Sequence, residues 1–332
     1  MPQVASGWIV LPILAVVAVG AFIWKKKRYV KVGCINRILF YPVKSLRGLE
    51  ITEGKCTKLG LEVNGLLDRS FMIISEEDNK LISQREAPTL SLLTPKIVDS
   101  NLIISGPNVD PLTVKIESTP NKDDKIIECQ VHGEVCYVVD CGEQASKWFQ
   151  NFLKRPNIRL VHFFPDFPKR KFVQNHQFFK KLREKHPISL QDIATFHVMS
   201  QSSIDDLNSR LVEKQISFRN FRPNILVDGC AAPFAEDSWQ YIKFGEEVEM
   251  ENVFPITRCL MTTVDPDKGI LTQKEPLTTL RKYRIPKDPK IIKILGSIPC
   301  FGTGCFVLKT GTIKVQDEIY ATITRPLDTV QK

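Results

Sequence analysis

Residues 304–323 read "GCFVLKTGTIKVQDEIYATI", a run in which apolar and polar residues alternate and which is interrupted by the turn "VQDE". Alternation with a period of two is the pattern of a half-buried β-strand. A second run of this kind, "WQYIKFGEEVEMENV" at 239–253, carries the turn "FGEE". Alternating runs with turns of this kind are typical of the corners of a small closed barrel. We therefore expect a β-barrel in the C-terminal part.

The rest of the chain from residue 33 onward is also rich in strand-like runs. A helix is predicted at 142–155, where "GEQASKWFQNFLKR" places its apolar residues on one face. The fold class that these patterns predict is β-rich α+β, with a β-rich N-terminal domain at 33–165, a basic linker at 166–187 and the barrel domain at 188–327. The strand-like runs outside these two segments are 35–43, 70–75, 101–105, 112–116, 128–140, 159–164, 224–229 and 256–264.

The N-terminus predicts a membrane anchor. "GWIVLPILAVVAVGAFIW" (7–24) has no charged residue and, as a helix, would span ~27 Å, close to the hydrocarbon thickness of a bilayer. Trp8 and Trp24 stand at its two ends, and "KKKR" follows directly. We expect one transmembrane signal-anchor helix with a basic flank over 1–32, with the bulk of the chain facing the cytosol. The alternative is a buried core helix.

Composition and missing motifs narrow the function. The chain of 332 residues has a net charge of +9 and nine cysteines, an odd number without repeated spacing, which argues against a disulfide scaffold. It has no GxxxxGK[ST] loop, no GxGxxG after a strand and no GxSxG elbow, so these nucleotide-binding and hydrolase classes have no support. A zinc site in "CQVHGEVCYVVDC" (129–141) is disfavoured, because alternation would distribute its ligands over both faces of a hairpin.

Polar residues with the chemistry of a cofactor site stand at the ends of several predicted strands, where a rigid scaffold usually carries function. Cations together with hydroxyl and amide groups suit a phosphate and a flat heterocycle, and a thiolate beside them is a soft ligand for a redox metal. The alternative for each residue alone is an ordinary surface position. The candidates are Lys44, Ser45, Arg69, Arg222, Asn224, Thr257, Arg258 and Cys259.

The motifs "YPVKS.RG", "LGL…DRSFMII", "ISQREAP", "FRPNI", "AEDSW" and "RC..TTVDPDKG" resemble the mitochondrial amidoxime-reducing component family of the MOSC superfamily, from residue 33 to about 325. The resemblance implies a MOSC-type β-barrel, a MOSC-associated N-terminal domain and a molybdenum-molybdopterin cofactor. It makes Cys259 the metal ligand and the catalytic residue, and it assigns the other seven candidates to the pterin and its phosphate. Two departures stand out, Ile193-Ala194 in place of a Thr-Ser pair and "FGTGCF" (301–306) in place of a segment with a tyrosine.

The activity implied by this resemblance is the reduction of N-hydroxylated compounds such as amidoximes and hydroxylamines, with nitrite and nitrate as further candidates. Electrons would come from NADH through cytochrome b5 reductase and a cytochrome b5-type haem protein, and the anchor would lie in the mitochondrial outer membrane, with the endoplasmic reticulum as the alternative. Two other functions stay open: a molybdopterin-binding sulfur-transfer or cofactor-carrier module, and a membrane-tethered scaffold that binds anionic lipid.

A basic stretch at 168–186, "PKRKFVQNHQFFKKLREKH", is either a solvated linker or a docking surface. Because cytochrome b5 domains are acidic, the stretch could steer such a partner to the chain. In this hypothesis Lys180, Lys181 and Arg183 are the docking cations.

Overall fold

The structure is a computed structural model that describes residues 27–172, 177–212, 215–324 and 328. The predicted anchor helix at 7–24 lies outside the described residues. Among the helices that the structure does describe, none is both long enough and apolar enough to cross a bilayer.

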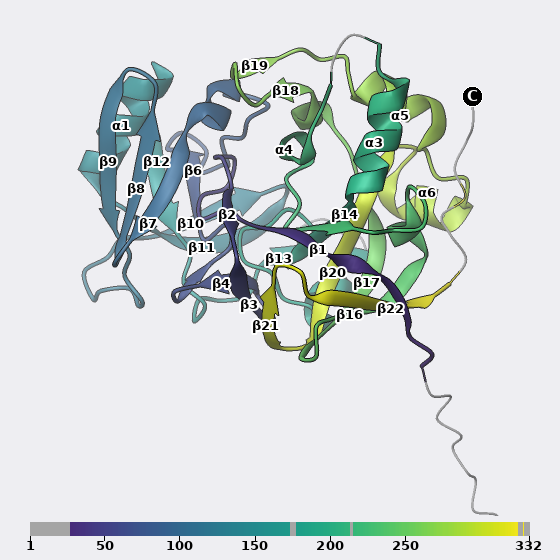
Figure 1. The fold of residues 1–332 in the computed structure, drawn as a ribbon. Helices are drawn as coiled ribbons and strands as arrows, with labels where there is room; N and C mark the ends of the chain where they lie inside the picture. The colour runs from purple at the N-terminus through teal and green to yellow at the C-terminus, as the bar shows by residue number, and fades with distance from the viewer. Residues whose placement is uncertain (1–26, 173–176, 213–214, 325–327, 329–332) are drawn as a thin grey trace, which may run out of the picture.

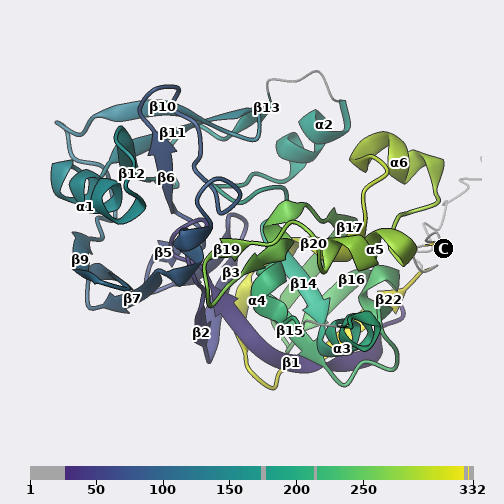
Figure 2. The same ribbon diagram turned by 90° about the horizontal axis from the view of Figure 1, so that it is seen from above.

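Seven strands form a closed barrel, in the order β15-β14-β20-β17-β16-β22-β1, and the pairing of β1 with β15 closes the ring. The prediction of a barrel from 239–253 and 304–323 is therefore confirmed. Figure 2 looks across this barrel, which occupies one half of the molecule. Its strands are β1 (Val30–Phe40), β14 (Phe196–Ser200), β15 (Ile225–Asp228), β16 (Trp239–Phe244), β17 (Val248–Thr257), β20 (Cys300–Lys309) and β22 (Glu318–Ile323).

The barrel is not built from the C-terminal part alone. β1 lies antiparallel to both β15 and β22, so the first described strand of the chain completes the wall. The short strand β2 (Leu49–Ile51) then pairs with β1. Beside the barrel, β21 (Gly311–Lys314) pairs with β3 (Glu53–Thr57) in a sheet that continues through β4 (Gly60–Val63) and β5 (Leu66–Leu67). The ranges 33–165 and 188–327 stay proposals as domain boundaries.

The other half of the molecule holds two small antiparallel sheets, seen at the left of Figure 1. Helix α1 (Glu143–Leu153) contacts both sheets: Ser146 Oγ donates to Ile158 O at 2.6 Å, and Trp148 Nε1 donates to Asp110 O at 2.7 Å. The first sheet contains β6 (Phe71–Ser75), β10 (Ile126–Val131), β11 (Glu134–Asp140), β12 (Ile158–His162) and β13 (Lys171–Phe172). The second sheet contains β7 (Thr94–Val98), β8 (Asn101–Gly106) and β9 (Val109–Lys115).

A single hydrophobic cluster runs through both halves, from Phe149 and Leu160 in the sheets to Phe244 and Ile319 in the barrel. This continuity fixes the halves against each other. The remaining elements cover the barrel or connect its strands. They are η1 (Pro88–Leu92), α2 (Gln177–Lys185), α3 (Gln201–Arg210), α4 (Phe218–Phe221), η2 (Ala235–Ser238), η3 (Leu260–Thr263), β18 (Val264–Asp265), β19 (Ile270–Leu271), α5 (Leu277–Tyr283) and α6 (Pro289–Leu295).

The hairpin of β10 and β11 distributes the candidate zinc ligands over both faces of the sheet, as the sequence predicts. Cys129 and Cys136 are directly opposite each other and share one face, with their Sγ atoms 3.2 Å apart, whereas Cys141 packs against the other core cluster. His132, in the turn, hydrogen-bonds instead to Asp192 at 3.0 Å. Among the residues with described positions, no group of three or more His, Cys, Asp or Glu side chains could hold a metal ion.

The basic stretch between the halves carries a buried ion network. Glu134 is only 2 % exposed, and its carboxylate accepts from Arg183 Nε at 2.9 Å and Nη2 at 3.0 Å. Arg170 Nε lies 3.2 Å from the same carboxylate. The expectation that Arg183 is a docking cation is therefore wrong, because its guanidinium is needed to compensate a buried charge. Lys180 and Lys181 are exposed.

Replacing Glu134 with alanine would leave both guanidinium groups buried without their carboxylate. Removing one partner of a buried ion pair typically costs about 3–5 kcal/mol. We expect Glu134→Ala to lower the free energy of unfolding in urea by this amount. Glu128→Ala, at an exposed position of the same hairpin, is the matched control and should change it by less than about 1 kcal/mol. Equal effects of the two variants would contradict the role of the network.

Candidate cofactor-binding site

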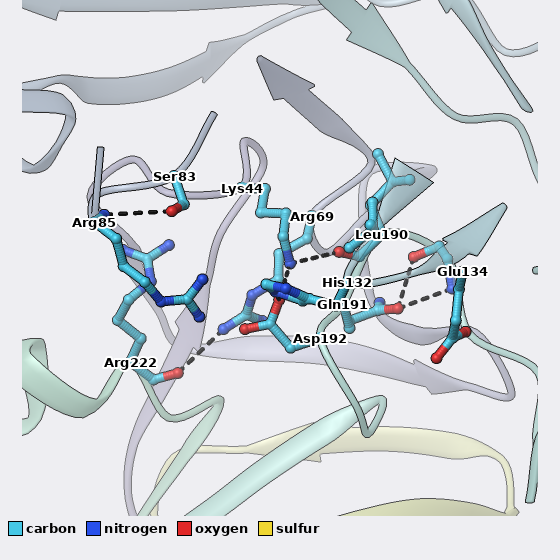
Figure 3. Close-up of polar contacts among 12 residues, drawn as sticks. Lys44, Arg69, Ser83, Arg85, His132, Glu134, Leu190, Gln191, Asp192 and Arg222 are labelled. Carbon is cyan, nitrogen blue, oxygen red and sulfur yellow. Dashed lines mark hydrogen bonds and ion pairs between the residues drawn. The ribbon is translucent and has the colours of Figure 1, made fainter. Parts of the chain in front are cut away.

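A cavity of about 90 Å³ lies where strands of the barrel meet the loops of the N-terminal half. Figure 3 shows Lys44, Arg69, Arg85 and Arg222 gathered around this space together with Asp192. The structure brings six of the eight predicted site residues into its lining. These six are Lys44, Ser45, Arg69, Arg222, Asn224 and Arg258.

Three of these residues have a left-handed backbone: φ is 72° at Ser45, 56° at Arg69 and 58° at Arg222. This conformation costs of order 1–3 kcal/mol at a residue other than glycine, and such residues cluster at functional sites. The surrounding backbone holds the loops in place, because Lys44 N donates to Phe71 O at 2.7 Å and Arg69 N donates to Tyr41 O at 2.6 Å. The folded chain therefore holds three left-handed residues around this cavity, among thirteen non-glycine residues with positive φ in the part that the structure describes.

Asn224 and Asp68 position Arg69. The Asn224 Oδ1 atom accepts from Arg69 Nη1 at 3.4 Å and from the backbone N–H of His197 at 3.2 Å. Asp68 is completely buried, and its carboxylate accepts from Arg69 Nη1 and from the N–H of Tyr41. Because the Asn224 side chain already ties β14 to Arg69, its main role in the cavity is to orient the guanidinium.

Tyr41 orders two of the guanidinium groups. Arg69 and Arg222 lie over its ring, at 4.4 and 4.3 Å from the centroid. Such cation–π contacts stabilise a desolvated guanidinium without neutralising its charge. A β-carbon at Gly48 would stand 2.5 Å from the Tyr41 ring, so glycine at this position is required by the stack.

Positive charge dominates the lining of the cavity. Five cationic side chains face a single carboxylate among the lining residues, that of Asp192. Burial lowers the pKa of Arg222 to about 10, which leaves its guanidinium charged at neutral pH, and its buried Nη2 has no hydrogen-bond partner. A buried donor without a partner carries a desolvation penalty that a bound acceptor relieves. The site thus fits an anionic group such as a phosphate.

Lys44, Asp192 and His132 form a polar chain at one side of the cavity. Lys44 Nζ donates to Leu190 O at 2.8 Å and to Asp192 Oδ1, which also contacts His132 Nε2. Burial lowers the pKa of Lys44 to about 8 despite the nearby carboxylate. Burial acts to raise the pKa of Asp192, but the charges of Lys44 and His132 hold it well below its usual value.

Cys259 and Thr257 do not line the cavity. Cys259 is exposed, and its Sγ accepts a hydrogen bond from Arg85 Nε at 3.2 Å; Arg85 is itself a lining residue, so the sulfur lies at the margin. Thr257 is half-buried and pairs with Cys300 at the end of β17. A volume of about 90 Å³ is below the ~300–1,000 Å³ of ordinary ligand pockets. Binding of a pterin here would therefore require lining side chains such as Arg85 to move.

Arg258 is directed into the protein. It is buried, its Nε donates to Phe301 O at 2.9 Å, and its Nη2 lies 2.5 Å from His197 Nε2. Burial and, second, the charge of Arg258 hold the pKa of His197 well below its ordinary value, so the imidazole is neutral and accepts this hydrogen bond. Burial lowers the pKa of Arg258 itself to about 9.

The two departures from the family pattern lie side by side. Ile193 and Ala194 line the cavity, and a β-carbon at Gly304 would meet the Ala194 side chain at 3.1 Å. A β-carbon at Gly302, where φ is 70°, would come within 2.5 Å of His197 Nε2. Small residues in 301–306 thus make room for Ala194 and for His197.

Sequence reasoning missed Arg85, Asp192, His132 and His197. Arg85 stands inside the motif "ISQREAP" and could have been found there. No local signal marks the others, because His132 and Asp192 are 60 residues apart in the sequence and His197 meets Arg258 across 61 residues.

The chain matches the MOSC N-terminal beta barrel domain over residues 32–156 and the MOSC domain over 185–320, so it is a MOSC-domain protein. It is 39 % identical to mitochondrial amidoxime-reducing component 1 of Mus musculus (92 % of this chain, 89 % of the relative) and 37 % identical to that of Homo sapiens (96 % and 95 %). Component 2 of Bos taurus is 36 % identical (89 % and 85 %). The chain belongs to the family of mitochondrial amidoxime-reducing components.

The buried charge of Lys44 predicts a pH-dependent stability. Below pH 8 the Lys44 amine is protonated in both the folded and the unfolded chain. The folded state then bears the cost of the buried charge, which is about 3 kcal/mol for a pKa of about 8 against an ordinary 10.5. Between pH 8 and 10.5 the folded state releases its proton first and this cost disappears. We therefore expect Lys44→Met to stabilise the cofactor-free chain by about 1–3 kcal/mol at pH 7 and by progressively less toward pH 10.5.

Denaturant titrations at pH 7, 8.5 and 10 would measure this difference. Lys55→Met, at an exposed position that pairs with Glu62, is the control and should show no such trend. Destabilisation of Lys44→Met at pH 7 would show that the Asp192 ion pair outweighs the burial of the ammonium group.

Proposed function

We propose that the chain is a molybdenum-cofactor-dependent reductase of N-hydroxylated compounds, with amidoximes and hydroxylamines as its substrate class and nitrite as a further candidate. Membership of the amidoxime-reducing component family supports the reductase class. The observation that carries the proposal is the cavity with five cationic side chains, one of which, Arg85, holds the exposed sulfur of Cys259.

The residues of the chain divide between anion binding and metal ligation. Lys44, Arg69 and Arg222 would hold the pterin and its phosphate, with Ser45, Asn224, Thr257 and Arg258 contributing the remaining polar contacts assigned by the family pattern. Cys259 would ligate the metal as a thiolate, which a nearby guanidinium favours. When bound, the cofactor supplies two-electron redox chemistry at the margin of the cavity.

The proposed reaction consumes protons as well as electrons. An amidoxime takes up two electrons and two protons, its N–O bond breaks, and an amidine and water leave. Lys44 Nζ lies in a polar chain beside the cavity, and burial lowers its pKa to about 8 in the chain without its cofactor. Asp192 Oδ1 connects this group to His132 Nε2, whose side chain is 37 % exposed, so the polar chain would allow protons to enter from solvent.

The electron source and location are part of the same proposal. Electrons would come from NADH through cytochrome b5 reductase and a cytochrome b5-type haem protein. The chain would be a single-pass protein of the mitochondrial outer membrane with its bulk in the cytosol; the names of its relatives and the apolar run at 7–24 support this location. The endoplasmic reticulum membrane is the alternative.

The Cys259 thiol provides the direct test. We expect Cys259→Ala to fold normally by circular dichroism but to contain no stoichiometric molybdenum and to show no measurable benzamidoxime reduction with reconstituted haem protein and reductase. Cys259→Ser should retain part of the metal through its oxygen. Cys34→Ala removes a half-buried thiol in β1 and is the control with full metal content.

Turnover that survives Cys259→Ala would refute the assignment of the ligand. A wild-type chain that contains molybdenum but reduces no N-hydroxylated compound would instead favour the sulfur-transfer or cofactor-carrier alternative. A chain without molybdenum, expressed in a host that makes the cofactor, would favour the lipid-binding scaffold.

The exposed lysines of α2 test the partner. Lys180→Gln/Lys181→Gln should slow electron delivery from the haem protein by roughly 10-fold at low salt, because steering by surface charge acts on the association rate. Reduction by a small artificial donor should not change. Lys282→Gln, at an exposed position on α5, is the control for loss of a surface charge. If the haem-dependent rate equals that of the control, the docking hypothesis fails.

A further inference from the structure

A second cavity, of about 210 Å³, lies next to the proposed cofactor site and has no role in the proposed function. Its walls come from the end of β1, from β2, and from η1, α4 and β18. Figure 1 shows α4 and β18 on the upper side of the molecule, above β1. Arg222 and Met261 line both cavities and so separate them.

Three buried donors around this second cavity lack hydrogen-bond partners. They are Arg47 Nε, Ser91 Oγ and Arg222 Nη2, and all three residues line it. Ser91 is only 3 % exposed, so its hydroxyl has no access to bulk water. Each unpaired buried group carries a penalty of about 1–3 kcal/mol, which an acceptor that reaches it after a local shift of side chains would relieve.

The cationic side chains of the lining are only partly compensated by carboxylates. Arg47 and Arg219 lie close enough to contact the same groups, Asp267 Oδ1 at 3.4 and 2.7 Å and Pro266 O at 3.2 and 2.9 Å. Burial and, second, the charge of Arg219 lower the pKa of Arg47. Asp267 is an exposed carboxylate shared by two guanidinium groups, and Glu50 is already paired with Arg37. An additional anion would therefore be attracted here.

The shape and chemistry of the cavity select the kind of anion. The donors come from different elements: Arg222 from the C-terminal end of α4, Ser91 from η1 and Arg47 from the loop between β1 and β2. Such an arrangement suits a tetrahedral oxyanion, because its oxygens accept hydrogen bonds in several directions. The volume exceeds that of a single phosphate, and apolar side chains, those of Leu39, Phe218 and Val264, complete the lining. A phosphate that carries a small organic group satisfies both features.

We propose that this cavity is a second anion-binding site, separate from the cofactor pocket, which takes a small phosphate monoester. Arg47, Ser91 and Arg219 bind the phosphate group, and the apolar side chains contact its organic part. Since Arg222 also borders the cofactor pocket, occupation of this site neutralises a cation that both cavities share.

Calorimetric titration of the full-length, molybdenum-loaded protein with phenyl phosphate and with inorganic phosphate tests the proposal, at constant ionic strength set with chloride. We expect saturable binding of both, tighter for phenyl phosphate. Arg47→Gln and Ser91→Ala should each weaken it at least tenfold, and Arg47→Lys should restore part of the affinity. Arg155→Gln removes an exposed guanidinium that lies 3.9 Å from Glu86, and as the control it should bind like the wild type.

Absence of saturable binding to the wild-type protein would overturn the proposal, as would equal affinities for Ser91→Ala and wild type. Loss of molybdenum from Arg47→Gln or Ser91→Ala would also overturn it, because the cavity would then be part of the cofactor pocket. Benzamidoxime reduction measured on the same samples separates the two proposals: failed phosphate binding with normal turnover rejects this site alone, and absent molybdenum in the wild type rejects the reductase.

Discussion

The structure depends on the pairing of β1 with both β15 and β22. This single strand closes the barrel, and its end leads directly into the loop that carries Lys44 and Ser45. Because each part of β1 is paired with at least one neighbouring strand, the loop that follows β1 begins at a fixed position. Arg222 and Asn224 stand just before β15, the strand that β1 contacts, so one pairing brings two segments far apart in the sequence to a common site.

The buried cations show that this site is not arranged for stability alone. Arg222 keeps a buried nitrogen without a partner, and Ser45, Arg69 and Arg222 hold left-handed backbones. By contrast, Arg183 reaches a carboxylate with two nitrogens and donates a third hydrogen bond to Ile193 O. Arg183 thus uses all three of its guanidinium nitrogens to hold the fold together, whereas Arg222, which borders a cavity, is incompletely paired, and this is the difference expected between a structural and a ligand-binding role.

The sequence predicted those parts of the molecule that local patterns determine. Alternation in 239–253 and 304–323 identified barrel strands, and polar residues at strand ends, four of them cations, identified six residues of one cavity. What it could not predict was pairing across long separations. The barrel includes a strand that begins at residue 30, Arg183 pairs with Glu134, and His132 contacts Asp192. These pairings depend on burial and charge compensation, which do not depend on distance along the chain.

The guanidinium group of Arg222 borders both cavities. Its guanidinium stacks on Tyr41, and it donates to Leu46 O through Nη1, which leaves Nη2 for a ligand. Nη2 carries two N–H groups, so ligands in the neighbouring cavities would each accept from one of them and both gain from its charge, while the two anions would repel each other. The balance between these opposing effects determines whether occupation of one cavity weakens or strengthens binding in the other.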